Sequence, residues 1–99
     1  MNKILEGFKI ECSEKNWDSY GAEPVTNASL EQADLLLNWL KHIGAQDPRP
    51  VPTVDGGVQL EWHTGGLDVE LEINPDGKTC QFVVFKDCSL ILRSDPQDE

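Results

Sequence analysis

The first half of the chain repeats its apolar residues every three or four positions, which is the spacing of an amphipathic helix. We expect one helix over residues 2–15, ending before Gly21 and Pro24. A second helix is predicted over residues 28–43, and Gly44 ends it. Three side chains near its start are suited to cap it: Thr26, Asn27 and Ser29. Its predicted apolar face consists of Leu30, Ala33, Leu36, Leu37, Leu40 and Ile43.

The second half alternates apolar and polar residues, which is the period of strands with one buried face. A two-residue turn at Gly65-Gly66 places Leu60 opposite Leu71 and Glu61 opposite Glu70, with every apolar residue on one side. The chain is therefore predicted to be one α+β domain, residues 1–99, in which two N-terminal helices pack on an antiparallel meander of four or five strands. Residues 46–52 are expected to be a stiff connector, and residues 94–99 a frayed acidic tail.

The outer side of this sheet carries an acidic row beside an apolar row. A three-residue turn at Pro75-Asp76-Gly77 pairs Leu71 with Gln81, and a two-residue turn follows at Lys86-Asp87. Together these turns put Phe82, Val84 and Ile91 on the outer face, and Val83, Phe85, Leu90 and Leu92 inside. A four-residue loop would expose Val83 and Phe85 instead. The apolar row has two interpretations: a binding surface, or a second small core covered by the first helix.

Four carboxylates form the acidic row. The predicted partner-binding residues are Glu61, Asp68, Glu70, Glu72, Phe82, Val84 and Ile91. Like charges directly opposite each other, as Glu61 and Glu70 are, destabilise a sheet by up to about 1 kcal/mol. An acidic rim around apolar anchors is typical of a surface that binds another protein.

Composition supports a protein partner with a basic surface. The 99 residues hold 18 acidic and 8 basic side chains, which gives a formal charge of −10. This charge argues against direct binding to nucleic acid, because phosphate contacts need Lys and Arg. It is also compatible with a merely solvated acidic surface. The chain has no apolar run of about 18 residues, its N-terminus does not resemble a secretory signal, and its three cysteines are odd in number. We therefore expect a cytoplasmic protein that does not associate with membranes.

The sequence predicts neither catalysis nor a cofactor. Glu61 and Glu70 are expected on a flat sheet face, whereas acid–base work needs a cleft that separates two pKa values. His63 and the neighbouring acids lie in one plane and do not converge on a metal. Asp55-Gly56-Gly57 lacks the Lys of a phosphate-binding loop and is interpreted as a turn.

A second candidate surface is the segment Trp17-Asp18-Ser19-Tyr20-Gly21-Ala22. Trp17, Asp18 and Tyr20 could form a recognition spot, although core packing of the aromatic residues is favoured in so small a domain. This segment, together with Pro52-Thr-Val-Asp-Gly-Gly-Val-Gln-Leu-Glu-Trp62 and Leu67-Asp-Val-Glu-Leu-Glu-Ile-Asn-Pro-Asp-Gly77, resembles a group of small bacterial and phage-associated proteins of unassigned function. The resemblance covers roughly residues 16–77. It implies a shared fold and a prokaryotic or phage setting, and no activity.

The leading hypothesis is a small protein-binding module whose acidic row docks on a basic surface. Its most concrete version is an inhibitor carried by a phage or mobile element, which occupies the Lys- and Arg-lined groove of a host nucleic-acid-handling protein such as a CRISPR effector. One alternative is a toxin-neutralising partner, which would also bind a basic surface through its acidic charge. The other alternative is a structural module that forms a homodimer through its apolar row.

Overall fold

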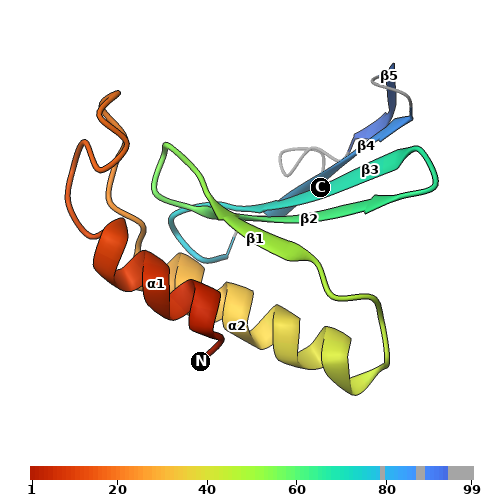
Figure 1. The fold of residues 1–99 in the computed structure, drawn as a ribbon, viewed down its shortest axis with the longest axis horizontal. Coiled ribbons are helices and arrows are strands. Elements are labelled where there is room, and N and C mark those ends of the chain that lie inside the picture. Colours follow the sequence, from red (N-terminus) through yellow and green to blue (C-terminus); the bar gives the residue numbers. More distant parts are fainter. Residues whose placement is uncertain (79, 87–88, 94–99) are drawn as a thin grey trace.

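The computed structural model describes residues 1–78, 80–86 and 89–93, the last five as backbone only. It confirms an α+β fold in which two helices precede an antiparallel sheet (Figure 1). The helices are α1 (Lys3–Glu11) and α2 (Asn27–His42). The strands are β1 (Arg49–Pro52), β2 (Val58–Thr64), β3 (Leu67–Ile73), β4 (Cys80–Lys86) and β5 (Ser89–Arg93). The predicted tail, residues 94–99, and Cys88 lie outside the described residues.

The strands follow one another in the order β1-β2-β3-β4-β5, as a meander. The prediction of a connector over residues 46–52 is wrong for its second half, because Arg49–Pro52 pairs with β2. Proline has no N–H to donate to a ladder, so Pro50 and Pro52 are compatible with a strand only at the edge of the sheet, where β1 lies.

Side-chain caps fix where both helices begin. The Asn2 side chain accepts a hydrogen bond from the backbone N–H of Ile4 at 2.7 Å, which starts α1. The hydroxyl of Thr26 accepts from the N–H of Ser29 at 3.1 Å, so Thr26 is the cap of α2. α1 ends at Glu11, earlier than predicted, and the chain then passes through a left-handed residue at Asn16 (φ 68°).

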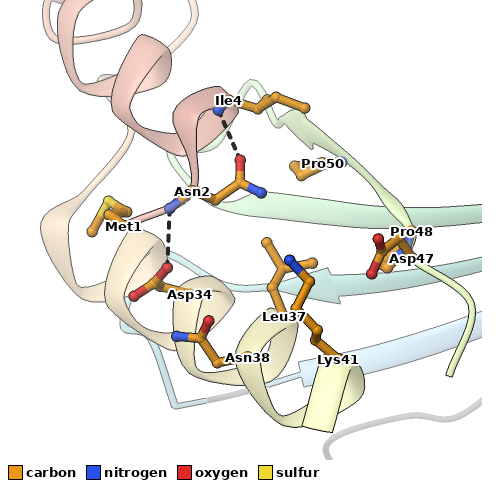
Figure 2. Close-up of a pocket in the computed structure, with 10 residues that line it drawn as sticks. All are labelled: Met1, Asn2, Ile4, Asp34, Leu37, Asn38, Lys41, Asp47, Pro48 and Pro50. Carbon is orange, nitrogen blue, oxygen red and sulfur yellow. Dashed lines mark hydrogen bonds between the residues drawn. The ribbon is translucent and has the colours of Figure 1, made fainter. Parts of the chain in front are cut away.

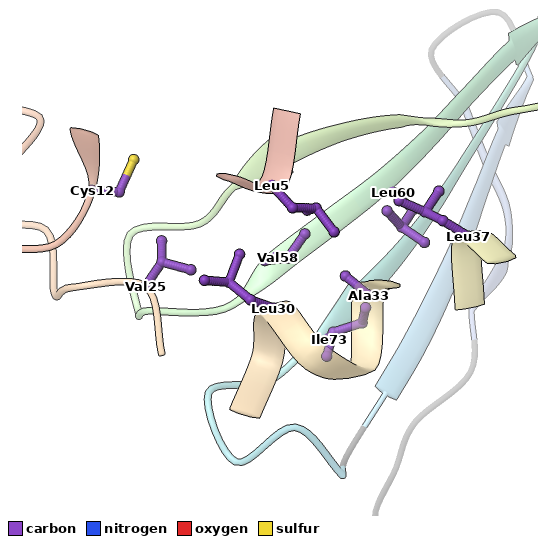
Figure 3. Packing of buried hydrophobic residues seen from close by; sticks show 9 residues of the cluster. All are labelled: Leu5, Cys12, Val25, Leu30, Ala33, Leu37, Val58, Leu60 and Ile73. Carbon is purple, nitrogen blue, oxygen red and sulfur yellow. The ribbon is translucent and has the colours of Figure 1, made fainter. Parts of the chain in front are cut away.

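The core lies between the two helices and one face of the sheet (Figure 3). Its buried members are Leu5, Cys12, Val25, Leu30, Ala33, Leu37, Val58, Leu60 and Ile73. The predicted apolar face of α2 is wider than the part that is buried. Leu36 and Leu40 are half-buried, and Ile43 is 53% exposed.

The helices cover only part of the sheet. α1 contacts β1, and α2 contacts β2 and β3. In the described part of the chain, no Cα atom of either helix comes within 8 Å of β4 or β5. The opposite side of the sheet, the outer face, has neither helix on it (Figure 1). The candidate site lies on this outer face.

Candidate functional site

The pairing of β2 with β3 brings the four predicted carboxylates together on the outer face. The predicted hairpin register is confirmed throughout: Glu61 lies opposite Glu70, and His63 opposite Asp68. Gln59 lies opposite Glu72. Paired residues of antiparallel strands project to the same side of the sheet. The alternate residues of the same strands, Val58, Leu60 and Ile73, are buried on the other side. We call Glu61, Asp68, Glu70 and Glu72 the acidic face.

Hydrogen bonds hold this row in place. His63 Nδ1 lies 2.6 Å from Asp68 Oδ1, and His63 Nε2 lies 3.3 Å from Glu61 Oε2. The side-chain amide of Gln59 donates to Glu61 Oε1 at 2.8 Å. With both ring nitrogens facing carboxylates, the arrangement favours a protonated imidazole. The Glu61 side chain is only 18% exposed, so the network fixes its direction.

The pKa values of Glu70 and His63 are both raised, for different physical reasons. Partial burial is the main cause that raises the pKa of the Glu70 carboxyl, followed by the negative charges of Glu61 and Asp68. Hydrogen bonds to Asp68 and Glu61 raise the pKa of the His63 imidazole. Glu70 makes no side-chain hydrogen bond among the described residues, so the negative charges around it are not offset by a donor of its own. The acidic face therefore holds a carboxylate whose ionised form is disfavoured.

Among the residues whose side chains are described, one permanent cation lies on the outer face. Arg49 of β1 lies opposite Glu61 in the register, yet among the described residues it forms no ion pair. Sequence reasoning missed it, because its strand was not predicted. In the described part of β1, β2 and β3, four carboxylates against one guanidinium and one imidazole leave the outer face negative.

The predicted apolar row is on the wrong side for two of its three members. β3 pairs with β4 so that Leu71 lies opposite Phe82 and Val69 opposite Val84, which puts both partners on the helix side. The residues beside the acidic face are Val83, opposite Glu70, and Phe85, opposite Asp68. This is the register of the four-residue loop. Both side chains are half-buried.

Tertiary contacts explain the longer loop. The Thr26 hydroxyl donates to the carbonyl of Pro75 at 2.6 Å, and a Cβ on Gly77 would lie 2.5 Å from the carbonyl of Ala28. The turn is thus packed on the start of α2, and this contact sets its length rather than the local turn type. Ile91 is the extra residue where the pairing steps from Phe85–Leu90 to Val84–Leu92. Its side chain lies outside the described residues.

The three residues of the second candidate surface, Trp17, Asp18 and Tyr20, have different environments in the structure. Trp17 packs against the core and donates its indole N–H to the carbonyl of Glu23 at 2.7 Å. The Asp18 carboxylate accepts from the N–H groups of Tyr20 (2.8 Å) and Ala22 (3.0 Å), which shapes the loop. Tyr20 alone of the three is fully presented, at 92% exposure. The core interpretation fits Trp17 and the surface interpretation fits Tyr20.

The Asp-Gly-Gly segment is a turn, as expected, and it also packs against the start of α2. The N–H of Gly57 donates to the Thr53 hydroxyl at 2.9 Å, and the carbonyl of Gly56 accepts from the N–H of Thr26 at 3.0 Å. These glycines serve the fold, because a Cβ on Gly57 would lie 2.1 Å from the carbonyl oxygen of Ile73.

A pocket of about 450 Å³ opens on the other side of the molecule, between the N-terminus, α2 and β1 (Figure 2). Its lining residues are Met1, Asn2, Ile4, Asp34, Leu37, Asn38, Lys41, Asp47, Pro48 and Pro50. The Asp34 carboxylate accepts from the backbone N–H of Asn2 at 3.2 Å, so it helps to anchor α1. The charged groups of this lining are the carboxylates of Asp34 and Asp47 and the amine of Lys41. Pro50 pairs with the buried Leu60, so the pocket and the acidic face lie on opposite sides of the sheet.

The residues that the structure describes form neither a metal site nor a membrane-spanning helix. No three His, Cys, Asp or Glu side chains among them converge in a way that could hold a metal ion. None of the helices in that part of the chain is long and apolar enough to span a membrane.

Known proteins supply no family for this chain, which matches no protein-family model, no curated protein and no solved structure. The functional argument consequently depends on the geometry of the acidic face.

Proposed function

We propose that the protein is a small binding module whose acidic face docks on a basic surface of another protein. The observation that carries this proposal is the direct opposition of Glu61 and Glu70 on a sheet face that neither helix covers. Like charges in this position destabilise the free protein. A guanidinium or ammonium group placed between them removes the repulsion and gains charge-assisted hydrogen bonds.

The neighbouring residues supply the rest of an interface. Val83 and Phe85 lie on the same face, next to Glu70 and Asp68. An apolar contact beside a charged rim is the usual arrangement in protein–protein interfaces. The hydrogen bonds from Gln59 and His63 fix Glu61 before binding, so little side-chain entropy is lost on docking.

The spacing of the acids favours a partner that handles nucleic acid. Asp68, Glu70 and Glu72 repeat along β3 at intervals of about 7 Å, which makes a linear row of negative charge. Grooves that follow a nucleic-acid backbone are lined by Lys and Arg and recognise such rows. The protein would act as an inhibitor that excludes nucleic acid from the groove, without catalysis. A CRISPR effector is one candidate target, and a nucleic-acid-cleaving toxin is another of the same class.

The proposal is tested by measuring whether nucleic acid and salt release a captured partner. The immobilised protein is incubated with a prokaryotic lysate, and bound proteins are eluted first with duplex DNA or RNA and then with rising salt. We expect a basic nucleic-acid-binding protein that nucleic acid displaces, and whose affinity falls steeply between 50 mM and 500 mM salt. A partner that stays bound in about 1 M salt and resists nucleic acid would refute the charge-based mechanism.

A further inference from the structure

The pocket between α2 and β1 combines a buried apolar floor with charged side chains at its rim (Figure 2). Leu37 of α2 is 9% exposed, and Pro48 and Pro50 are buried. Lys41 of α2 and Asp47, which lies in the segment before β1, are exposed. The volume of about 450 Å³ falls within the range of about 300–1,000 Å³ that is usual for sites that bind small molecules.

Hydrogen bonds hold the walls of this pocket in place. Gly44 has a φ of 73°, and the N–H of Ala45 donates to a carbonyl in the last turn of α2 at 2.9 Å, so the chain reverses where the helix ends. The indole N–H of Trp62 donates to the carbonyl of Gln46 at 2.8 Å, which ties the returning segment to β2. The two prolines of the floor have a fixed φ. A ligand would therefore order little of the chain when it binds.

The charged groups at the rim are not neutralised by one another. Lys41 and Asp47 lie at the same end of the pocket, because the turn at Gly44 joins the segments that carry them (Figure 2). Among the described residues, neither side chain forms an ion pair. Asp34, the third charged residue of the lining, accepts from the backbone N–H of Asn2 at 3.2 Å and helps to anchor α1. An ammonium and a carboxylate are thus both available to a ligand at one end of an apolar floor.

We propose that this pocket binds a small zwitterion, an α-amino acid with an apolar side chain. The carboxylate of the ligand pairs with Lys41, its ammonium group pairs with Asp47, and its side chain lies on Leu37 and the two prolines of the floor. Both contacts are charge-assisted hydrogen bonds. A ligand with a carboxylate alone is repelled by Asp47 and by the net charge of −10, and a ligand with an ammonium alone is repelled by Lys41.

This inference does not depend on the proposed function, because the pocket and the acidic face lie on opposite sides of the sheet. A ligand in the pocket leaves the acidic face accessible to a partner. Failure of the one therefore says nothing against the other.

Three related compounds test the two charge contacts separately. L-phenylalanine carries both charges, N-acetyl-phenylalanine lacks the ammonium, and phenylalanine amide lacks the carboxylate. Each is titrated into the ¹⁵N-labelled protein, and amide chemical shifts are followed by NMR. We expect L-phenylalanine to shift the amides of Leu37, Lys41 and Asp47 with a dissociation constant below about 10 mM, and both analogues to bind at least about 10-fold more weakly.

Two variants assign the contacts to residues, and both change an exposed side chain, so the fold should be kept. Lys41→Gln should bind L-phenylalanine and its amide equally, and Asp47→Asn should bind L-phenylalanine and its N-acetyl analogue equally. Lys9→Gln and Glu14→Gln are the matched controls, because they remove the same charges from exposed residues outside the pocket. These controls should keep the wild-type preference for the zwitterion.

Three results would each overturn the proposal. The first is the absence of saturable shifts with up to about 50 mM L-phenylalanine. The second is a set of shifts confined to residues outside the pocket. The third is equal binding of all three compounds to the wild type, which would show that neither Lys41 nor Asp47 contacts the ligand.

Discussion

Replacing Glu70 by Gln should make the protein more stable at neutral pH. The substitution keeps the shape of the side chain and removes one of two opposed charges. It breaks no hydrogen bond within the described residues. Two unit charges about 5 Å apart repel each other by about 0.8 kcal/mol in water. Screening in 0.15 M salt, where the Debye length is about 8 Å, lowers this to about 0.5 kcal/mol. For a domain of this length, the gain corresponds to a rise of about 2–4 °C in Tm.

The pH dependence of this gain follows from the raised pKa of Glu70. A carboxyl whose pKa is higher in the folded protein than in the unfolded chain destabilises the fold only when it is ionised. The cost is fully present above the folded-state pKa, and it disappears as the pH falls toward the ordinary value of 4.5. The advantage of Glu70→Gln should therefore be present at pH 7, shrink in 1 M salt and vanish below pH 4.5.

Thermal and urea unfolding of the wild type, Glu70→Gln and Glu14→Gln measure this difference. Glu14 is exposed in the loop after α1, so Glu14→Gln reports the effect of removing one charge from a chain of net charge −10. Only the excess of Glu70→Gln over this control belongs to the acidic face. Equal gains in the two variants, or a loss in Glu70→Gln, would refute the opposed-charge reasoning.

Four further substitutions separate the contributions to stability. Gly57→Ala should lose more than about 4 kcal/mol in urea unfolding, because its Cβ would meet the Ile73 carbonyl at 2.1 Å. Gly65→Ala meets no atom within 4 Å and should cost only the strain of its positive φ, about 1–2 kcal/mol. Leu60→Ala empties a fully buried position and should cost about 2–5 kcal/mol. The pKa of His63 is raised in the folded protein, so protonated His63 stabilises the fold at pH values below its unfolded-state pKa of 6.5. This stabilisation is lost as the pH rises through the folded-state pKa. His63→Gln should therefore flatten the fall in Tm between about pH 6 and pH 9.

Local sequence signals were sufficient for the first hairpin and the second helix. Gly65-Gly66 joins two segments whose apolar residues alternate in phase, and only one register buries them all, so the pairing of Leu60 with Leu71 follows from the sequence. The extent of α2 follows equally from its periodicity and from Gly44.

The predictions that were wrong concern segments whose local sequence is compatible with two structures, and tertiary contacts determine which of the two forms. The Pro75-Asp76-Gly77 turn fits either loop length, and its contacts with Thr26 and Ala28 at the start of α2 select the longer one. A shift of one residue then moves Phe82 and Val84 from one face to the other. Similarly, Arg49–Pro52 looks like a connector, because two prolines conceal an edge strand.

The central claim is that the acidic face, and not the total charge, selects the partner. The most direct measurement compares partner binding by Glu61→Lys/Glu70→Lys with binding by Glu6→Lys/Glu31→Lys, in which two exposed helix residues change the net charge equally. With both variants shown to be folded, the account predicts that the first loses the captured partner and the second retains it. Equal loss in the two variants would show that net charge alone is responsible, and retention by the first would exclude the acidic face as the binding surface.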